Sequence, residues 1–323
     1  MKRLNLFIYI CLFYTSCLQS VTLVYNMKIR RIFNLAAHLN KEAKSRLVFS
    51  TVPIFYRRTR EITDAGLLKP VQANPLTESI NLFEKTNSGG ALLNLRYVSG
   101  SAWVEFTTGI ERETLTASGN TPINAARTGF DDIIFSGGYN FNMGNNAQIV
   151  LYGLAGFPTN RKVTLNERFN SLVGTKFFSL GFGTEFSYAF VNSLKKSLIF
   201  IFQTRLLHFF NRSWFPVLPQ NAEIQPGNSI DLLFTLNYRH KKNIFEIGYN
   251  PTFLTNSGIN LSSTEIRAKT LIRNSFYFSF THFLKNLPII NKPFVFGSGF
   301  SFATAQEFNT KAFAWWLNFT LVF

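Results

Sequence analysis

The sequence has little cysteine, little charge and no long apolar run beyond its first residues. Its two cysteines, Cys11 and Cys17, both lie near the N-terminus. The chain after Cys17 therefore contains no disulfide, no cysteine metal ligand and no cysteine nucleophile. Charged residues make up 15% of the 323, below the ~25% of an average soluble domain. After Tyr25 there is no run of 18 apolar residues, which excludes a membrane-spanning helix beyond the leader.

Aromatic residues are abundant, in contrast to the charged ones. They make up 16% of the chain, and 37 residues are Phe. This composition excludes a disordered tail, a collagen-like repeat and a small disulfide scaffold. Few charges together with many aromatics indicate that much of the surface does not face water.

The N-terminal segment is typical of an export signal. Lys2 and Arg3 precede an apolar stretch from Leu4 to Leu18, the arrangement of a signal peptide. We expect residues 1–20 to be this signal, with the cleavage site left open. An uncleaved anchor and lipidation of Cys17 are the alternatives. Residues 21–45 are then a basic periplasmic tail or a short amphipathic helix.

Beyond this segment, large apolar residues recur at every second position. The last strand shows the pattern most fully, with small or polar residues filling most of the positions between Phe313, Trp315, Leu317, Phe319, Leu321 and Phe323. Since side chains alternate across a strand, one face of each such strand is almost wholly apolar. Similar alternation begins near Phe178, Leu232, Phe276 and Phe294.

Strand length and polarity distinguish a membrane barrel from a soluble β-sandwich. Sandwich strands average about 5–6 residues, whereas the alternating stretches here run longer. Their polar face carries mostly Gly, Ser, Thr and Asn, which suits a crowded polar lumen. The pattern predicts an all-β chain in which residues 46–323 form a single antiparallel up-and-down transmembrane β-barrel.

Twelve strands account for the alternation, although ten or fourteen are also compatible with it. The weakest is the first, because it contains Pro53. The predicted strands are 46–57, 90–98, 101–112, 130–141, 147–158, 176–189, 197–209, 230–240, 243–253, 270–283, 292–304 and 311–323. Long and short connections largely alternate between them, as in outer-membrane barrels with short periplasmic turns. The longest connection, 58–89, is our candidate constriction or lid. The expected outer loops are 113–129, 159–175, 210–229 and 254–269.

The net charge of +16 is unevenly distributed. Residues 1–46 and the short turns carry most of it, and the turn lysines suit contact with anionic lipid headgroups. No basic patch interleaved with aromatics occurs, so nucleic-acid binding is excluded. The predicted lumen face is mixed, and the candidate pore-lining residues are Arg96, Glu105, Glu111, Asp132, Glu185, Arg205, Asp231, Arg239, Glu246 and Arg273. We expect these opposed charges to be structural pairs, with a selectivity or substrate site as the alternative.

The sequence gives little sign of catalysis. Zinc-protease, nucleophile-elbow, dinucleotide and P-loop motifs are all absent. His208 and His282 face outward by their position in the pattern, but neither begins the His-x-Ser-Asn-Gly run of outer-membrane phospholipases. Asp131 and Asp132 are adjacent, so we expect them on opposite faces, where they cannot form an acid pair. We expect no enzyme activity, no metal and no cofactor.

The closing stretch Trp315–Phe323 resembles the C-terminal insertion signal of bacterial outer-membrane proteins. Those chains end in an aromatic residue with hydrophobic residues alternating upstream, here Phe319, Leu321 and Phe323. The resemblance implies insertion by the barrel-assembly machinery. Residues 129–189 also resemble uncharacterised barrels regarded as transporters, through stretches such as Asp131–Tyr139 and Gly153–Pro158.

Together these observations favour a porin-like channel or transporter in the outer membrane of a Gram-negative-type envelope. It would pass small polar solutes, and membrane lipids would surround it. Twelve strands leave only a narrow passage, since eight give a filled interior and sixteen a wide channel. The alternative is an occluded structural or adhesion barrel whose outer loops bind a partner. The oligomeric state is left open.

Overall fold

The computed structural model describes most of the chain from Ser45 onwards. The described residues are 45–63, 81–118, 123–159, 177–193, 195–210, 212–213, 223–225, 227–255, 258–261, 264–267, 270–284, 292–305 and 310–323. The expected signal peptide (1–20) and the basic segment from 21 to 44 lie outside them, and Ser45 already belongs to the first strand. Within the described ranges no helix is long and apolar enough to cross a membrane.

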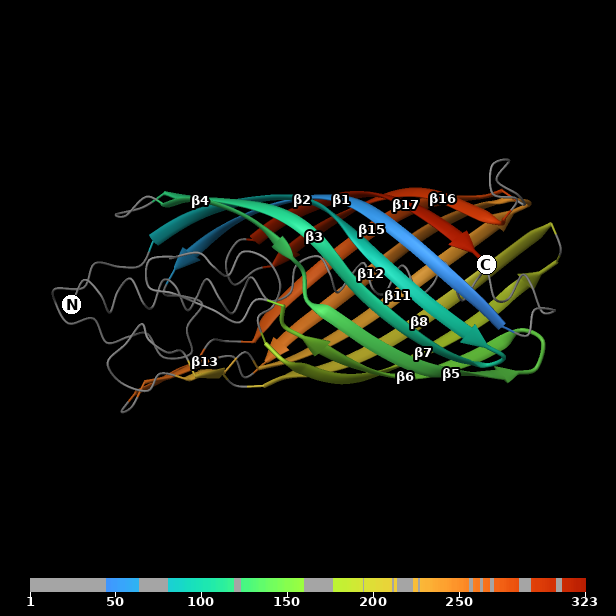
Figure 1. Cartoon of the computed structure of the whole chain (residues 1–323), viewed down its shortest axis with the longest axis horizontal. Coiled ribbons are helices and arrows are strands. Elements are labelled where there is room, and N and C mark those ends of the chain that lie inside the picture. The colour runs from blue at the N-terminus through green and yellow to red at the C-terminus, as the bar shows by residue number, and fades with distance from the viewer. Residues whose placement is uncertain are drawn as a thin grey trace.

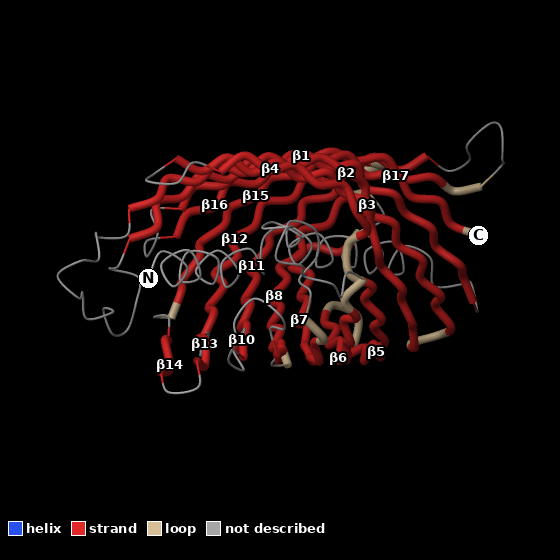
Figure 2. Tube along the Cα trace, turned by 60° about the vertical axis from the view of Figure 1, so that its left-hand side comes forward, coloured by secondary structure: helices blue, strands red, loops and turns tan. Residues whose placement is uncertain are grey.

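Twelve strands form a closed antiparallel cylinder (Figures 1 and 2). They are β1 (Ser45–Thr63), β2 (Asn81–Ser99), β3 (Ala102–Ser118), β5 (Ile133–Met143), β6 (Ala147–Phe157), β7 (Ser179–Asn192), β8 (Lys196–Phe209), β11 (Asn228–His240), β12 (Asn243–Thr255), β15 (Leu271–Leu284), β16 (Phe294–Ala305) and β17 (Thr310–Val322). Each strand pairs with its neighbours in sequence, and β1 pairs with β17 to close the wall. The predicted fold class and the count of twelve strands are confirmed.

Five further short strands extend the wall at the end where the long connections lie. β4 (Ile123–Phe130) continues along β3 beyond the pairing of β3 with β5. The other four form a small separate sheet and are β9 (Arg212–Ser213), β10 (Glu223–Gln225), β13 (Gly258–Leu261) and β14 (Thr264–Arg267). Parts of three expected outer loops are therefore β-structure, while residues 160–175 of the fourth lie outside the described residues.

The prediction that residues 58–89 form a lid or constriction is wrong for the residues of this range that the structure describes. β1 continues to Thr63 and β2 begins at Asn81, and these two residues face each other in the β1–β2 ladder. Residues 58–63 and 81–89 are therefore barrel wall, and 64–80 lie outside the described residues. This part of the hairpin carries polar and charged residues at both parities, so apolar alternation could not mark it as strand.

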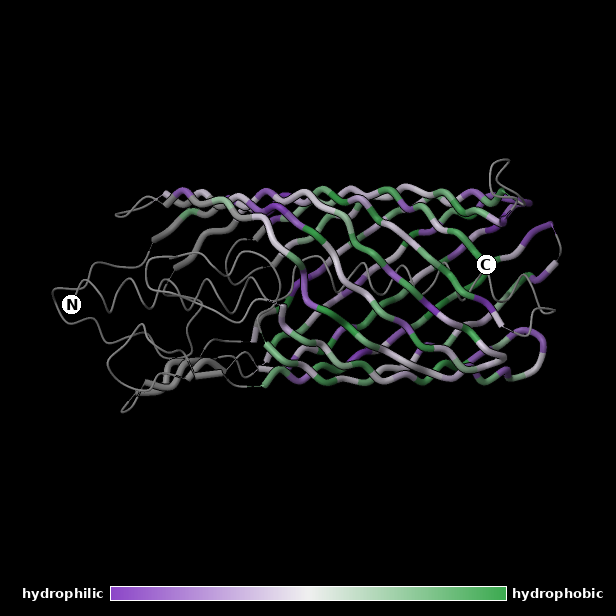
Figure 3. Tube along the Cα trace, viewed as in Figure 1, coloured by the Kyte–Doolittle hydropathy of each residue, from purple (hydrophilic) through white to green (hydrophobic). Residues whose placement is uncertain are grey.

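The two faces of the wall differ sharply in polarity. Large apolar side chains are exposed on the outer face, for example Phe182 (60%), Ile247 (59%) and Phe300 (48%). Residues at the intervening positions are buried inside the cylinder. Figure 3 shows the resulting alternation of hydropathy along the strands. A single sheet that closes on itself with an apolar exterior is the arrangement that hydrocarbon requires.

Pro53 is accommodated within β1 by a local gap in one ladder. The β1–β17 pairing runs through Thr51 and resumes at Ile54, whereas the β1–β2 pairing continues through Pro53 and Ala91. Proline lacks the N–H that the ladder needs. The first strand therefore survives its proline because only one of its two neighbours loses contacts there.

Two short turns depend on glycine. Gly100 and Gly144 have φ of 58° and 76°, in the region that glycine enters without steric cost. The turn at Lys241 instead places a lysine at φ 53°. Its amide donates to the Lys195 carbonyl at 2.7 Å, which ties it to the neighbouring β7–β8 turn.

Several inward-facing aromatic rings lie flat against the wall over a glycine of the adjacent strand. A Cβ on Gly248 would collide with the Tyr277 ring, and one on Gly183 would collide with the Tyr152 ring. Gly138 and Gly299 have the same relation to Trp103 and Trp316. The Tyr277 hydroxyl and the Thr235 hydroxyl are hydrogen-bonded at 2.6 Å across Gly248. The glycines thus allow large rings to lie along the wall rather than project toward the axis.

This packing predicts that Gly248→Ala is costly. The added methyl group would force the Tyr277 ring from its position, so we expect unfolding free energy to fall by about 1–3 kcal/mol. Gly153→Ala is the matched control, because a Cβ there meets nothing nearer than 3.9 Å, and we expect a change within about 0.5 kcal/mol. Urea unfolding in detergent micelles measures both. Equal stability of the two variants would contradict the proposed role of the glycine.

Candidate functional site

The interior of the cylinder is lined by polar and charged side chains. All ten residues predicted to face the lumen lie on the inner face of the wall. Arg96, Glu105, Asp132, Glu185, Arg205, Asp231 and Arg239 are buried there, while Glu111, Glu246 and Arg273 are half-buried. Arg96 and Arg205 are among the largest side chains that are fully buried. The inner face is therefore the candidate functional site.

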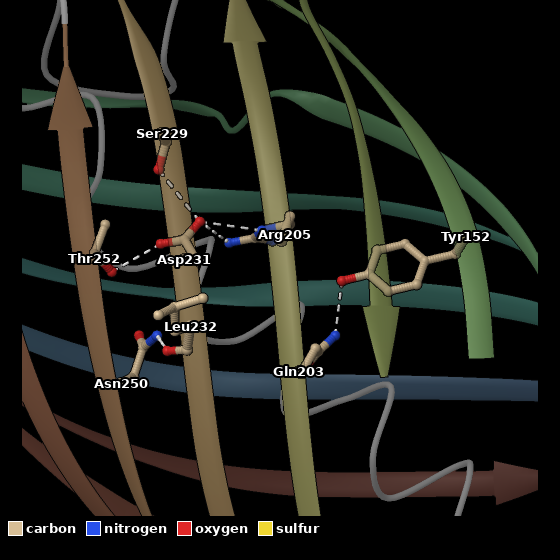
Figure 4. Close-up of polar contacts among 8 residues, drawn as sticks. All are labelled: Tyr152, Gln203, Arg205, Ser229, Asp231, Leu232, Asn250 and Thr252. Carbon is tan, nitrogen blue, oxygen red and sulfur yellow. Dashed lines mark hydrogen bonds and ion pairs between the residues drawn. The ribbon is translucent and has the colours of Figure 1, made fainter. Parts of the chain in front are cut away.

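Asp231 organises one part of this interior (Figure 4). Its Oδ2 accepts hydrogen bonds from Arg205 Nη2 at 3.0 Å and Nε at 3.2 Å, and from the Ser229 hydroxyl at 3.3 Å. Its Oδ1 accepts from the Thr252 hydroxyl at 2.8 Å. Strands β8, β11 and β12 thus supply four donors to one carboxylate. A buried charge needs such saturation to be tolerated.

Two more arginines belong to the same region. Arg273 on β15 lies opposite Thr252 in the ladder and within electrostatic range of Asp231, Arg205 and Arg58. Arg58 on β1 donates from Nη2 to the Thr86 hydroxyl at 3.2 Å. Sequence reasoning missed Arg58 because the first strand was ended at residue 57. The continued alternation of inward positions through Tyr56 would have revealed it.

The wall around β3 is acidic instead. Glu105, Glu111 and Glu113 all face inward from this strand. Glu105 Oε1 accepts a hydrogen bond from the Ser136 hydroxyl at 3.3 Å, and Glu111 accepts one from the Ser88 hydroxyl. Sequence reasoning missed Glu113 because the third strand was ended at residue 112. The inner face of β3 is thus acidic, whereas the region around Asp231 contains several arginines.

Asp131 and Asp132 correct one expectation. They were expected on opposite faces, but both are buried, at 2% and 5% exposure. Ile110 pairs with Phe130 and Thr107 pairs with Ile134, so the β4–β5 side contains one residue more than β3 across this stretch. The Asp131 amide donates to the Gly109 carbonyl at 2.9 Å. A β-bulge of this kind breaks the alternation and adds both carboxylates to the acidic region.

Arg96 and Trp103 form a further contact on the inner face. The Arg96 guanidinium carbon lies 4.1 Å from the centre of the Trp103 ring, a cation–π geometry. Arg96 also stands opposite Glu105 in the β2–β3 ladder. Planar stacking and an acidic neighbour together stabilise this buried guanidinium.

The three histidines that the structure describes all lie on the outer face. His208 Nδ1 is hydrogen-bonded to Asn228 Oδ1 at 2.7 Å, and His282 Nδ1 to Asn243 Oδ1 at 2.6 Å. These imidazoles are separated by the wall from the interior carboxylates. Over the described ranges, no group of three His, Cys, Asp or Glu side chains is arranged to hold a metal ion.

Comparison with known proteins supports the architecture. No protein-family model matches the sequence, and no curated protein matches it. Among solved structures, the fold is similar to the COG4313 outer membrane channel from Pseudomonas putida F1, with a TM-score of 0.56 and 14% identity over 85% of this chain and 95% of that one. It is also similar to the transport unit of the autotransporter AIDA-I from Escherichia coli, with a TM-score of 0.54 and 9% identity over 90% and 96% of the two chains.

These observations define the class of the protein. A single antiparallel sheet of twelve strands closes on itself, its exterior is apolar and its interior is polar. The chain is therefore a twelve-stranded β-barrel with the architecture of bacterial outer-membrane proteins.

Because Asp231 accepts four hydrogen bonds, we expect its mutation to lower the unfolding free energy more than mutation of Arg205 does. Asp231→Asn leaves the Arg205 and Arg273 guanidinium groups without their shared carboxylate, so we expect a loss of about 3–5 kcal/mol in unfolding free energy. Arg205→Gln keeps Asp231 near Arg273, and we expect a smaller loss. Chemical unfolding of the refolded barrel measures both values. A smaller effect for Asp231→Asn than for Arg205→Gln would contradict the central position of the carboxylate.

Proposed function

We propose that the protein is a porin-like channel or transporter of the outer membrane that passes small polar solutes. The observation that carries this proposal is the closed twelve-stranded cylinder with a charged and hydroxyl-rich inner face. An apolar exterior suits hydrocarbon, and a polar interior suits solutes that hydrocarbon excludes. The similarity of fold to the Pseudomonas channel supports the same function.

The inner face also suggests which solutes are favoured. Arginines come from β1, β2, β8, β11 and β15, while carboxylates are most numerous on β3 and at the bulge. Because both signs line the interior, we propose weak charge selectivity and a preference for solutes that make hydrogen bonds. The ten lumen-facing residues named from the sequence, together with Arg58, Glu113 and Asp131, are the proposed pore lining.

An occluded structural or adhesion barrel is the second candidate. It is favoured by the very low exposure of many inward side chains, with Ser50, Gln203 and Thr252 all at 0%. Val52, Leu233, Tyr277 and Trp316 also belong to one buried apolar cluster on the inner face. In that case the extensions formed by β4 and by the small sheet of β9, β10, β13 and β14 would carry partner recognition.

We further propose that the C-terminal strand carries the insertion signal. Phe319, Leu321 and Phe323 all lie on the outer face, and Phe323 is 51% exposed. An apolar row that ends in an exposed aromatic residue is available to the barrel-assembly machinery before the strand meets lipid.

Conductance distinguishes the two candidate functions. We expect purified protein in a planar bilayer to give current steps of reproducible size. The double variant Arg239→Gln/Arg273→Gln removes two inward cations, so the reversal potential in a salt gradient should shift toward cation selectivity. Arg57→Gln/Lys311→Gln removes two outward cations and should leave it unchanged. A silent bilayer with verified insertion would support the occluded barrel and contradict the channel.

A further inference from the structure

Charge is divided between the two faces of the wall. Every acidic side chain whose burial the structure describes lies on the inner face. Among the residues whose burial the structure describes, the charged side chains on the outer face away from the short turns are all cations. These four residues, which we call the outer basic patch, are Arg57, Lys85, Arg112 and Lys311.

The outer basic patch is confined to four adjacent strands. Thr59 on β1 pairs with Lys311 of β17 on one side and with Lys85 of β2 on the other. Arg57 lies two residues from Thr59 on the same face. Arg112 on β3 pairs with Gly89 of β2. Because neighbouring strands lie about 4.8 Å apart, the four strands span about 14 Å.

The patch begins where the exposed apolar side chains of the outer face, here called the apolar belt, end. Phe55, Ile110 and Phe313 are exposed at 43%, 48% and 43%, and each lies two residues from a patch cation, toward the short-turn end. The corresponding end of other strands is apolar on its outer face, for example at Phe157 and Leu180. The patch therefore occupies one sector of the boundary between hydrocarbon and headgroups.

The patch cations are available to an external anion. Arg57, Arg112 and Lys311 are exposed and Lys85 is half-buried. Within the described part of the chain, no carboxylate pairs with any of them. Two guanidinium groups offer bidentate geometry for phosphate, and two ammonium groups add point charge. The outward-facing Thr59 adds a hydroxyl donor between the strands, whereas the Thr116 hydroxyl donates to the Lys85 carbonyl at 3.4 Å.

We propose that the outer basic patch binds a membrane lipid whose headgroup carries more than one phosphate, in the leaflet at the long-connection end. The four cations spread over about 14 Å across the strands and, since Gly89 opposite Arg112 lies four residues from Lys85, about 13 Å along them, which matches several phosphates better than one. Continuity with Phe55, Ile110 and Phe313 assigns the ligand to a lipid, because its acyl chains would lie on these residues. The proposal rests on the membrane placement proposed above and is independent of conduction.

Lipid titration followed by native mass spectrometry tests this assignment on the purified full chain. The probes are diphosphoryl lipid A, monophosphoryl lipid A and phosphatidylcholine. We expect the wild-type protein to retain the diphosphoryl lipid most tightly and phosphatidylcholine least. Arg57→Gln/Lys85→Gln/Arg112→Gln/Lys311→Gln should weaken retention of the diphosphoryl lipid at least tenfold. Excess inorganic phosphate should compete poorly, since it lacks acyl chains.

The control variant removes the same number of charges at the other end of the barrel. It is Lys195→Gln/Lys196→Gln/Lys241→Gln/Lys242→Gln. These turn lysines also suit contact with anionic headgroups, so we expect a loss of at most about twofold, far below the tenfold loss of the patch variant. Unchanged binding by the patch variant, or an equal loss in the control, would overturn the proposal. Heat-modifiable gel migration checks that each variant folds, and Arg57→Gln/Arg112→Gln replaces the fourfold variant if that one does not. A barrel that binds the lipid without conducting would refute only the channel.

Discussion

The structure depends on closure of the backbone hydrogen-bond network between its first and last strands. In hydrocarbon an unpaired N–H or C=O costs several kcal/mol, so a sheet can span a membrane only without free edges. β1 and β17 meet this requirement. The Phe323 amide donates to the Leu47 carbonyl at 2.8 Å, and the Leu47 amide donates back at 3.2 Å. On the inner face, the Ser50 and Thr320 hydroxyls are hydrogen-bonded at 2.7 Å across the same seam.

Closure also creates two environments that the side chains must satisfy. The outer face carries the large apolar side chains that a soluble protein would bury in its core. The inner face carries buried charges, and Asp231 shows how these are tolerated, with hydroxyls and a guanidinium saturating the carboxylate. Glycines such as Gly248 keep large rings close to the wall. On the outer face, cations such as Arg57 and Arg112 lie where the exposed apolar side chains end.

The sequence was informative wherever one face of a strand was apolar. Alternation located all twelve strands and placed Arg205, Asp231 and Arg273 on the inner face, because a period of two fixes the facing of every residue once one is known. It could not follow β1 and β2 into residues 58–63 and 81–89, where both faces are polar. It also misplaced Asp131, because a bulge adds one residue and reverses the parity. The partners of Asp231 were unpredictable, since they depend on the stagger between strands and not on any one strand.

Closure of the cylinder is tested most directly by cross-linking the seam. In a background without Cys11 and Cys17, Ser50→Cys/Thr320→Cys should form a disulfide on mild oxidation of the folded protein, because the two hydroxyls lie 2.7 Å apart. Ser50→Cys/Ser229→Cys, on strands β1 and β11 that do not pair, should not. Non-reducing gel migration after boiling reports both. A folded protein whose seam pair stays reduced while the control pair cross-links would contradict the closed barrel.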